Sequence, residues 1–105
     1  MKQVMNRGAI SRAPTHPGEI LREDVLPSLG ISKAEFARNI RVSRQMLYDI
    51  LNCKRAITPS MALRLGKVLG NGPGIWAGMQ QKYDLFHAEQ DMATELDQMK
   101  VMYYR

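Results

Sequence analysis

The stretch VSRQMLYDILNCKR, residues 42–55, separates into an apolar and a polar side when it is wound as a helix at about 100° per residue. The apolar side holds Met46, Leu47, Ile50 and Leu51, and the opposite side holds Arg44, Gln45, Tyr48, Asp49 and Asn52. Arginine, glutamine and asparagine have the geometry for paired hydrogen bonds to base edges in a DNA major groove. The polar side is therefore either an ordinary solvated surface or one that contacts nucleic acid, and the neighbouring segments decide between them.

A second amphipathic helix is predicted directly before this stretch, over residues 32–40, SKAEFARNI. Ser32 stands three residues before Glu35, the arrangement of a capping box at a helix N-terminus. The apolar side of this helix holds Phe36, Ala37 and Ile40. Only two residues separate it from Ser43, which is suited to cap the following helix. Two helices joined by so short a turn, with small Ala37 where they meet, predict a helix-turn-helix.

Two further amphipathic helices are predicted on either side of this pair. The segment HPGEILREDVLPSLG, residues 16–30, has Pro17 near its first helical position and Gly30 as a stop. The segment TPSMALRLGKVLG, residues 58–70, has Thr58 as its predicted N-cap. The apolar sides are predicted to hold Ile20, Leu21 and Val25 in the first segment, and Met61, Ala62, Leu65, Val68 and Leu69 in the second.

The C-terminal third continues as helix after the break NGPG. A period of i, i+3, i+7, i+10 in residues 75–90 predicts a fifth helix, whose apolar stripe is Trp76, Met79, Tyr83 and Phe86. Core packing is the favoured interpretation of this stripe, and the alternative is a contact between two copies of the chain, since four short helices already close one core. A weaker apolar period after residue 91 predicts a sixth helix or a helical tail. We expect a flexible arm over residues 1–15, a helix-turn-helix domain over 16–88 and a helical tail over 89–105.

The excess of positive charge is concentrated around the predicted helix-turn-helix. The chain has a net charge of +5, and residues 33–67 contain eight basic and two acidic side chains, a local charge of +6. Residues 82–105 contain three basic and five acidic side chains, a local charge of −2. A basic surface attracts a polyanion such as DNA through counterion release and long-range attraction. On charge alone, a basic surface that serves only solubility remains the alternative.

Other classes of protein have little support in the sequence. At 105 residues the chain has room for one domain, and no apolar run approaches the roughly 18 residues that a membrane span requires. The single cysteine, Cys53, excludes an intramolecular disulfide and fits a reducing compartment, so we expect a cytoplasmic protein. Neither His16 nor His87 is spaced from Cys53 as metal ligands are, and we expect no metal ion and no cofactor. No nucleophile–base pair or glycine-rich phosphate loop is recognisable, so we expect no enzymatic activity.

The order of these segments resembles a known family. HPGEILREDVLPSLG, then SKAEFARNIRVSRQMLYDILNCKRAITPSMALRLGKVLG, and then PGIWAGMQQKYDL are similar to the HigA antitoxins, also described as virulence-associated protein I, among the lambda-repressor-like helix-turn-helix proteins. The resemblance implies an all-α, lambda-repressor-like domain of about five helices with a C-terminal helical extension. It also implies a homodimer that represses its own operon at a roughly palindromic DNA site. Such a protein silences a HigB-type toxin, which is a RelE-like mRNA endonuclease.

Two other functions remain open at the level of the sequence. A stand-alone helix-turn-helix regulator without a toxin partner is the main alternative, because antitoxin activity leaves no motif that physical chemistry identifies. A protein-interaction module that no longer binds DNA gains weight from Arg41 and Cys53, which stand where such motifs usually have glycine. A left-handed backbone at a non-glycine residue costs on the order of 1 kcal/mol, which a folded domain tolerates.

The resemblance and the side-chain chemistry together predict roles for the exposed polar residues. The residues expected to read bases are Arg44, Gln45, Tyr48 and Asn52. The residues expected to contact phosphates are Ser43, Arg38, Arg41, Lys54 and Arg55. Asp49 is expected to orient Arg44 or Gln45, or to cap charge, rather than to read a base. Tyr48 is expected to contact either DNA or the second copy in a dimer. His16 is expected to lie at the entrance to a helix.

Overall fold

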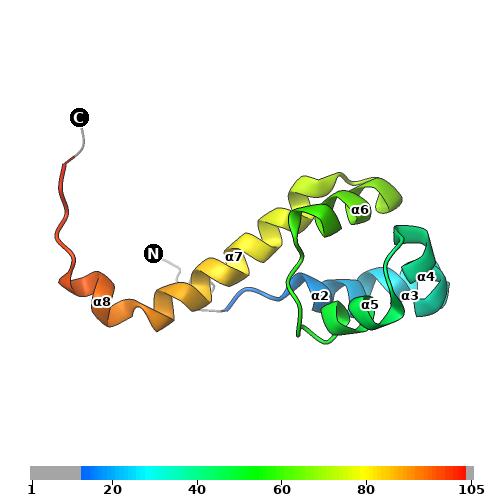
Figure 1. The fold of residues 1–105 in the computed structure, drawn as a ribbon, viewed down its shortest axis with the longest axis horizontal. Helices are drawn as coiled ribbons and strands as arrows, with labels where there is room; N and C mark the ends of the chain where they lie inside the picture. Colours follow the sequence, from blue (N-terminus) through cyan, green and yellow to red (C-terminus); the bar gives the residue numbers. More distant parts are fainter. Residues whose placement is uncertain (1–12, 104–105) are drawn as a thin grey trace, which may run out of the picture.

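The structure is a computed structural model that describes residues 13–103, and the regular elements of this part are all helical (Figure 1). They are α2 (Pro17–Ile20), the π-helical turn η1 (Leu21–Val25), α3 (Leu26–Leu29), α4 (Lys33–Ile40), α5 (Arg44–Leu51), α6 (Pro59–Leu69), α7 (Pro73–Asp91) and α8 (Ala93–Gln98). The all-α fold class predicted from the sequence is confirmed. The predicted flexible arm falls largely on residues 1–12, which lie outside the described part.

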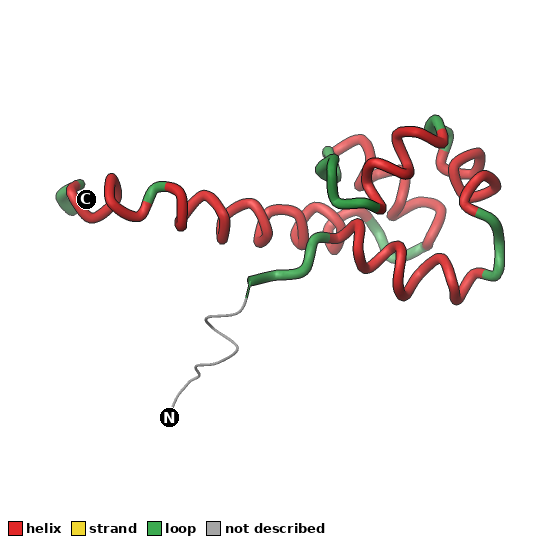
Figure 2. Tube along the Cα trace, turned by 90° about the horizontal axis from the view of Figure 1, so that it is seen from below, coloured by secondary structure: helices red, strands yellow, loops and turns green. Residues whose placement is uncertain are grey.

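The described helices form a compact body with one long projection. Elements α2 to α6 and the first half of α7 make up the body, and the rest of α7 extends away from it with α8 at its far end (Figures 1 and 2). α6 and α7 pack against each other within the body. The domain boundary expected at residue 88 stays a prediction, and α7 runs through this position to Asp91.

α2, η1 and α3 form one continuous helix whose middle turn is widened. The widened turn closes with a hydrogen bond from the N–H of Leu26 to the carbonyl of Leu21, five residues earlier. Pro27 follows at once, and a proline in a regular α-helix crowds the carbonyl four residues before it, so a wider turn at this point relieves the contact. The widening brings Leu21 and Leu26 to the same side, and both are buried. The α-helical period predicts Ile20, Leu21 and Val25 for this side and misses Leu26, while Ile20 and Val25 are half-buried against the core.

The core is built largely from the apolar sides that the sequence predicts for α4, α5 and α6. Its buried members are Leu21, Leu26, Phe36, Ala37, Ile40, Leu47, Ile50, Leu51, Ile57, Met61, Ala62, Leu65 and Trp76. The prediction is wrong for Val68, whose side chain is 43% exposed. Gly66 is buried instead, and a Cβ atom there would overlap the backbone of Gly72 and Pro73. The buried arc of α6 is therefore rotated toward Gly66, which leaves Val68 at its edge.

The apolar stripe predicted on α7 divides between the core and the surface. Trp76 is buried, and Met79 is half-buried against the core. Tyr83 and Phe86 are also half-buried, but they lie beside His87, whose ring centre is 4.4 Å from that of Tyr83 and 5.3 Å from that of Phe86. Core packing, the favoured interpretation of the stripe, therefore describes its first half.

Candidate nucleic-acid interface

Helix α5 is held by its apolar side and leaves its polar side open. Its N-terminus is capped by Ser43, whose hydroxyl accepts a hydrogen bond from the N–H of Met46 at 3.0 Å. Leu47, Ile50 and Leu51 are buried. The residues predicted to read bases are all exposed on the opposite side, and we call these four the reading face: Arg44, Gln45, Tyr48 and Asn52.

Asp49 organises one edge of the reading face. Its carboxylate accepts a hydrogen bond from Gln45 Nε2 at 2.8 Å, one helical turn earlier. The same carboxylate lies 3.6 Å from Arg55 Nη2. The prediction that Asp49 orients Arg44 or Gln45 is confirmed for Gln45. Arg55, which is predicted to contact a phosphate, is held beside the reading face by the same carboxylate.

Tyr48 lies beside a basic side chain that sequence reasoning did not connect with it. The Nζ atom of Lys33, from the first turn of α4, is 5.9 Å from the centre of the Tyr48 ring. A cation at this distance from an aromatic ring is attracted by the electron density of its face. No local spacing relates the two residues, since they come from different helices. Lys33 adds positive charge next to the reading face.

Both helices of the helix-turn-helix end in the same backbone motif. The hydrogen bonds run from Arg41 N–H to Arg38 C=O (3.1 Å), Val42 N–H to Ala37 C=O (3.0 Å), Cys53 N–H to Ile50 C=O (3.0 Å) and Lys54 N–H to Asp49 C=O (2.8 Å). This is the pattern of a Schellman motif, which requires a left-handed residue at the C-terminal end of the helix. Arg41, with φ of 62°, and Cys53, with φ of 61°, provide it. The left-handed positions predicted at these two residues are confirmed.

Two arginines from outside the helix-turn-helix complete these helix ends, and sequence reasoning misses both. Arg64 of α6 donates from Nη1 to the carbonyls of Ile40 at 3.0 Å and Arg41 at 3.3 Å. Arg22 of η1 donates from Nη1 to the carbonyl of Leu51 at 2.8 Å. Each donor and its acceptor are at least 23 residues apart in the chain. No short motif signals such a contact.

A hollow of about 380 Å³ lies between the turn of the helix-turn-helix and the start of α6. Its lining includes three guanidinium and three hydroxyl groups, from Arg41, Arg55, Arg64, Ser43, Thr58 and Ser60. Guanidinium and hydroxyl groups are frequent partners of phosphate oxygens in DNA complexes. Arg41, Ser43 and Arg55 are among the residues that the sequence predicts to contact phosphates, and Arg64, Thr58 and Ser60 are lining residues that it does not predict. Arg38 and Lys54 are exposed outside this lining.

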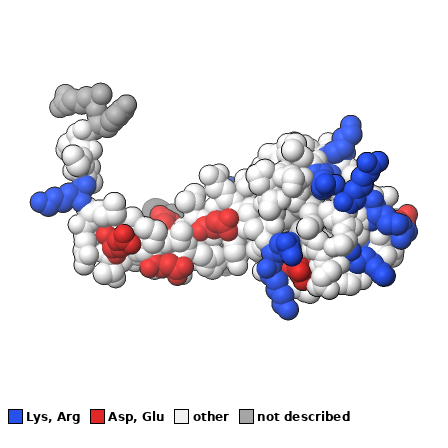
Figure 3. All heavy atoms as spheres, in the orientation of Figure 1, with Lys and Arg blue, Asp and Glu red and all other residues white. Residues whose placement is uncertain are grey.

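Basic and acidic side chains occupy different parts of the molecule. Figure 3 shows Lys and Arg spread over the compact body, whereas most of the visible Asp and Glu lie along α7 and α8. The reading face therefore belongs to the part of the surface that attracts a polyanion. None of the helices between residues 13 and 103 is long and apolar enough to cross a membrane.

His16 fixes the start of α2 and joins it to α7. Its Nδ1 atom accepts a hydrogen bond from the N–H of Gly18 at 2.9 Å, and its ring packs edge-on against Tyr83 with the centres 4.9 Å apart. Burial lowers the pKa of His16 below its ordinary value, although Asp84 and Glu19 act in the opposite direction. The expectation that His16 belongs to a helix entrance is confirmed.

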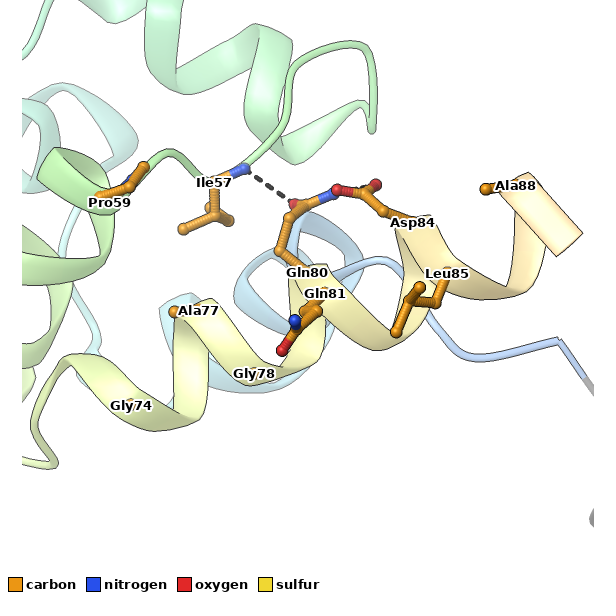
Figure 4. A pocket seen from close by; sticks show the side chains of 10 residues that line it. All are labelled: Ile57, Pro59, Gly74, Ala77, Gly78, Gln80, Gln81, Asp84, Leu85 and Ala88. Carbon is orange, nitrogen blue, oxygen red and sulfur yellow. Dashed lines mark hydrogen bonds between the residues drawn. The ribbon is translucent and has the colours of Figure 1, made fainter. Parts of the chain in front are cut away.

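A second surface feature, the α7 groove, is a hollow of about 660 Å³ along one side of α7 (Figure 4). It is lined by Ile57, Pro59, Gly74, Ala77, Gly78, Gln80, Gln81, Asp84, Leu85 and Ala88. Gln80 is buried, and its Oε1 atom accepts a hydrogen bond from the N–H of Ile57 at 2.8 Å, which ties α7 to the loop before α6. A Cβ atom added at Gly74 or Gly78 would meet nothing within 4 Å, whereas Leu85 is 56% exposed. The groove is therefore open at its glycine end and bears a projecting leucine toward the other.

The chain is similar to proteins of known class. The helix-turn-helix family matches residues 21–76, from η1 to the first turn of α7. Virulence-associated protein I of Dichelobacter nodosus is 43% identical over 76 residues, which are 72% of this chain and 70% of that protein.

Two solved structures have the same fold. The Pseudomonas aeruginosa antitoxin HigA with the higBA promoter is 33% identical, with a TM-score of 0.80 over 86% of this chain and 99% of that one. An addiction module antidote protein of the HigA family from Coxiella burnetii is 32% identical, with a TM-score of 0.79 over 88% of this chain and 100% of that one. The chain therefore belongs to the helix-turn-helix family, in the branch that contains virulence-associated protein I and the HigA antitoxins.

Proposed function

We propose that this helix-turn-helix regulator binds an operator, represses its own operon and acts as the antitoxin of a HigB-type toxin, a RelE-like mRNA endonuclease. The observation that carries the DNA-binding part is the reading face, four exposed side chains on a helix whose other side is buried and whose ends are both capped. The relative from P. aeruginosa, an antitoxin HigA with the higBA promoter, supports both parts. The antitoxin part also draws on the HigA-family antidote protein of C. burnetii.

In this proposal α5 enters the major groove with its N-terminal half nearest the bases. Arg44 and Gln45 then read bases first, and Tyr48 and Asn52 follow further along the same side. The hydrogen bond from Gln45 to Asp49 fixes the amide before DNA arrives, so less side-chain freedom is lost on binding.

In this proposal, residues near both ends of α5 contact the DNA phosphates. Ser43, Arg38 and Arg41 lie at or before its start, and Lys54 and Arg55 follow its end. Thr58, Ser60 and Arg64 extend this set, because they line the same hollow as Arg41, Ser43 and Arg55. A phosphate in this hollow meets charged and neutral donors together, which positions the protein without selecting a sequence.

We propose that the protein is a homodimer joined along the α7 groove. The groove is self-complementary along the helix: Leu85 projects near one end, and Gly74 and Gly78 leave open space near the other. A second copy placed on a two-fold axis near Gln81 would seat its Leu85 over the glycines of the first, and the reverse contact follows by symmetry. Such a dimer presents two reading faces to a roughly palindromic operator.

The alternative is a stand-alone regulator without a toxin partner, for which the reading face serves equally well. Growth of cells induced for any small reading frame found beside this gene separates the two functions. We expect arrest by that frame alone and rescue when this protein is expressed with it. Rescue should persist when Arg44 and Gln45 are both changed to alanine, because neutralisation does not require DNA reading. A neighbouring frame that is harmless, or toxic without rescue, would leave the stand-alone regulator.

A further inference from the structure

The C-terminal end of α5 is held by groups from the first helix of the body, outside the helix-turn-helix. Gly18 lies against the carbonyl of Ile50 so closely that an added Cβ atom would overlap the oxygen. Four residues later, Arg22 donates a hydrogen bond from Nη1 to the next carbonyl, that of Leu51, at 2.8 Å. The carbonyls of two successive α5 residues therefore contact the same side of the first helix of the body.

The hydrogen bond from Arg22 to Leu51 pairs the last carbonyl at the C-terminal end of α5. The final four carbonyls of an α-helix have no hydrogen-bond partner within the helix. In α5 three of these carbonyls, from Tyr48, Asp49 and Ile50, accept hydrogen bonds from the N–H groups of residues 52–54. The fourth, from Leu51, accepts the bond from Arg22. Arg22 thus completes the helix end directly before Asn52, a member of the reading face.

The arginine side chain is itself held in position. Its Nε atom donates to Glu23 Oε2 at 2.8 Å, which leaves Nη1 directed at Leu51. A hydrogen bond from a charged donor is stronger than one between neutral groups. Arg22 also lines a small hollow with Lys33, Tyr48 and Asn52, so a change at this position alters the surroundings of the second half of the reading face.

We infer that Arg22 is a positioning residue for DNA recognition, which sets the reach of Tyr48 and Asn52 by fixing the C-terminal end of α5. Arg44 and Gln45 lie at the other end, where the Ser43 cap and the short turn fix the helix. The inference rests on the proposed DNA-reading function. It adds to that function a residue, Arg22, whose side chain contacts α5 at a backbone carbonyl. A loss at Arg22 therefore disturbs one half of the reading face more than the other.

The experiment compares sequence preferences selected from a pool of random DNA duplexes. Wild-type protein defines the operator, and Arg44→Ala and Asn52→Ala identify the base pairs that depend on each end of α5. Arg22→Met removes the hydrogen bond, and Arg22→Lys keeps a cationic donor. Lys82→Met, on the exposed side of α7, is the control for the loss of one positive charge. Thermal melts establish that each variant is folded at the temperature of selection.

We expect Arg22→Met to lose roughly 10-fold of its preference at the base pairs that Asn52→Ala also affects, and to keep its preference at those lost in Arg44→Ala. Arg22→Lys should give a smaller loss of preference at the same base pairs. If Arg22→Met does not fold, the result for Arg22→Lys tests the inference. An unchanged pattern with a lower melting temperature would overturn the inference and leave Arg22 a residue of the fold. Equal weakening at all base pairs with a shallower salt dependence would also overturn it, in favour of a phosphate contact. A wild-type protein that selects no sequence would instead refute the proposed function.

Discussion

His16 couples the fold to the protonation state of its imidazole. Its neutral Nδ1 atom caps α2 by accepting the Gly18 N–H bond, and its ring packs against Tyr83 of α7. Protonation places a hydrogen on Nδ1 and abolishes the acceptor. The start of α2 and its contact with α7 therefore depend on a neutral imidazole.

The first prediction concerns the pH dependence of unfolding. Burial lowers the folded-state pKa of His16 below its ordinary value of 6.5, so below this pH the unfolded chain binds more protons than the folded one. The contribution to stability is complete above pH 6.5 and is lost as the pH falls through the folded-state pKa. Urea unfolding of the wild type should show this decline, and His16→Asn, which caps without titrating, should show less of it. Equal declines in the two proteins would contradict the assignment.

At the scale of elements, the approach of the helices is set by residues without side chains. Gly18 allows α2 to touch the Ile50 carbonyl of α5, and Gly66 allows α6 to touch the chain at Gly72. Gly78 is different, because it faces the open α7 groove. The same substitution should therefore have opposite effects on the two kinds of helical glycine.

The second prediction uses this matched pair. Gly18→Ala should lower the free energy of unfolding by roughly 1–3 kcal/mol, because the new methyl group overlaps a backbone oxygen that has little room to move. Gly78→Ala should raise it by roughly 0.5–1 kcal/mol when the protein is dilute enough to be monomeric, because alanine favours the helix and meets no neighbour within its own chain. Urea denaturation of the three proteins measures both changes. If both substitutions changed the free energy of unfolding in the same direction and by a similar amount, the close approach of α2 to α5 would not be rigid.

The elements were predictable where short-range chemistry decides them. Ser32 and Ser43 cap the helices that their spacing predicts, and Arg41 and Cys53 adopt the left-handed conformation at positions where glycine is usual. The widened turn η1 was not predictable, because a period of 3.6 residues assumes a regular helix. Long-range contacts were also not predictable from the sequence pattern. Arg22, Arg64 and Gln80 bind backbone groups at least 23 residues away, and local periodicity contains no information about such partners.

At the scale of the whole molecule, two surfaces carry opposite charges. The basic body carries the reading face, and the projecting part of α7 carries much of the visible acidic surface (Figure 3). The α7 groove lies between them, along a helix that begins in the body and leaves it (Figures 1 and 4). A dimer formed there places the two reading faces on one rigid unit.

The third prediction tests this dimer. Gly78→Trp should fill the groove without disturbing the monomer, because the space above Gly78 is empty. We expect sedimentation to show a dimer for the wild type and a monomer for Gly78→Trp, with the helical circular dichroism unchanged. Lys82→Met, on the same helix but outside the groove lining, is the control and should remain dimeric. A Gly78→Trp protein that still forms the dimer would place the interface elsewhere.

The central claim, that α5 reads an operator sequence, is tested most directly by titrating the DNA upstream of this gene, its single-base-pair variants and a shuffled duplex with three proteins at several salt concentrations. The wild type should prefer the upstream duplex by about 10³-fold or more, with binding that weakens steeply as salt rises. Arg44→Ala should lose roughly 1–3 kcal/mol of discrimination at one base pair, whereas Lys54→Ala should weaken both duplexes alike and lower the salt slope by about one. Equal binding of the two duplexes by the wild type, or unchanged discrimination at every base pair in Arg44→Ala, would contradict the account.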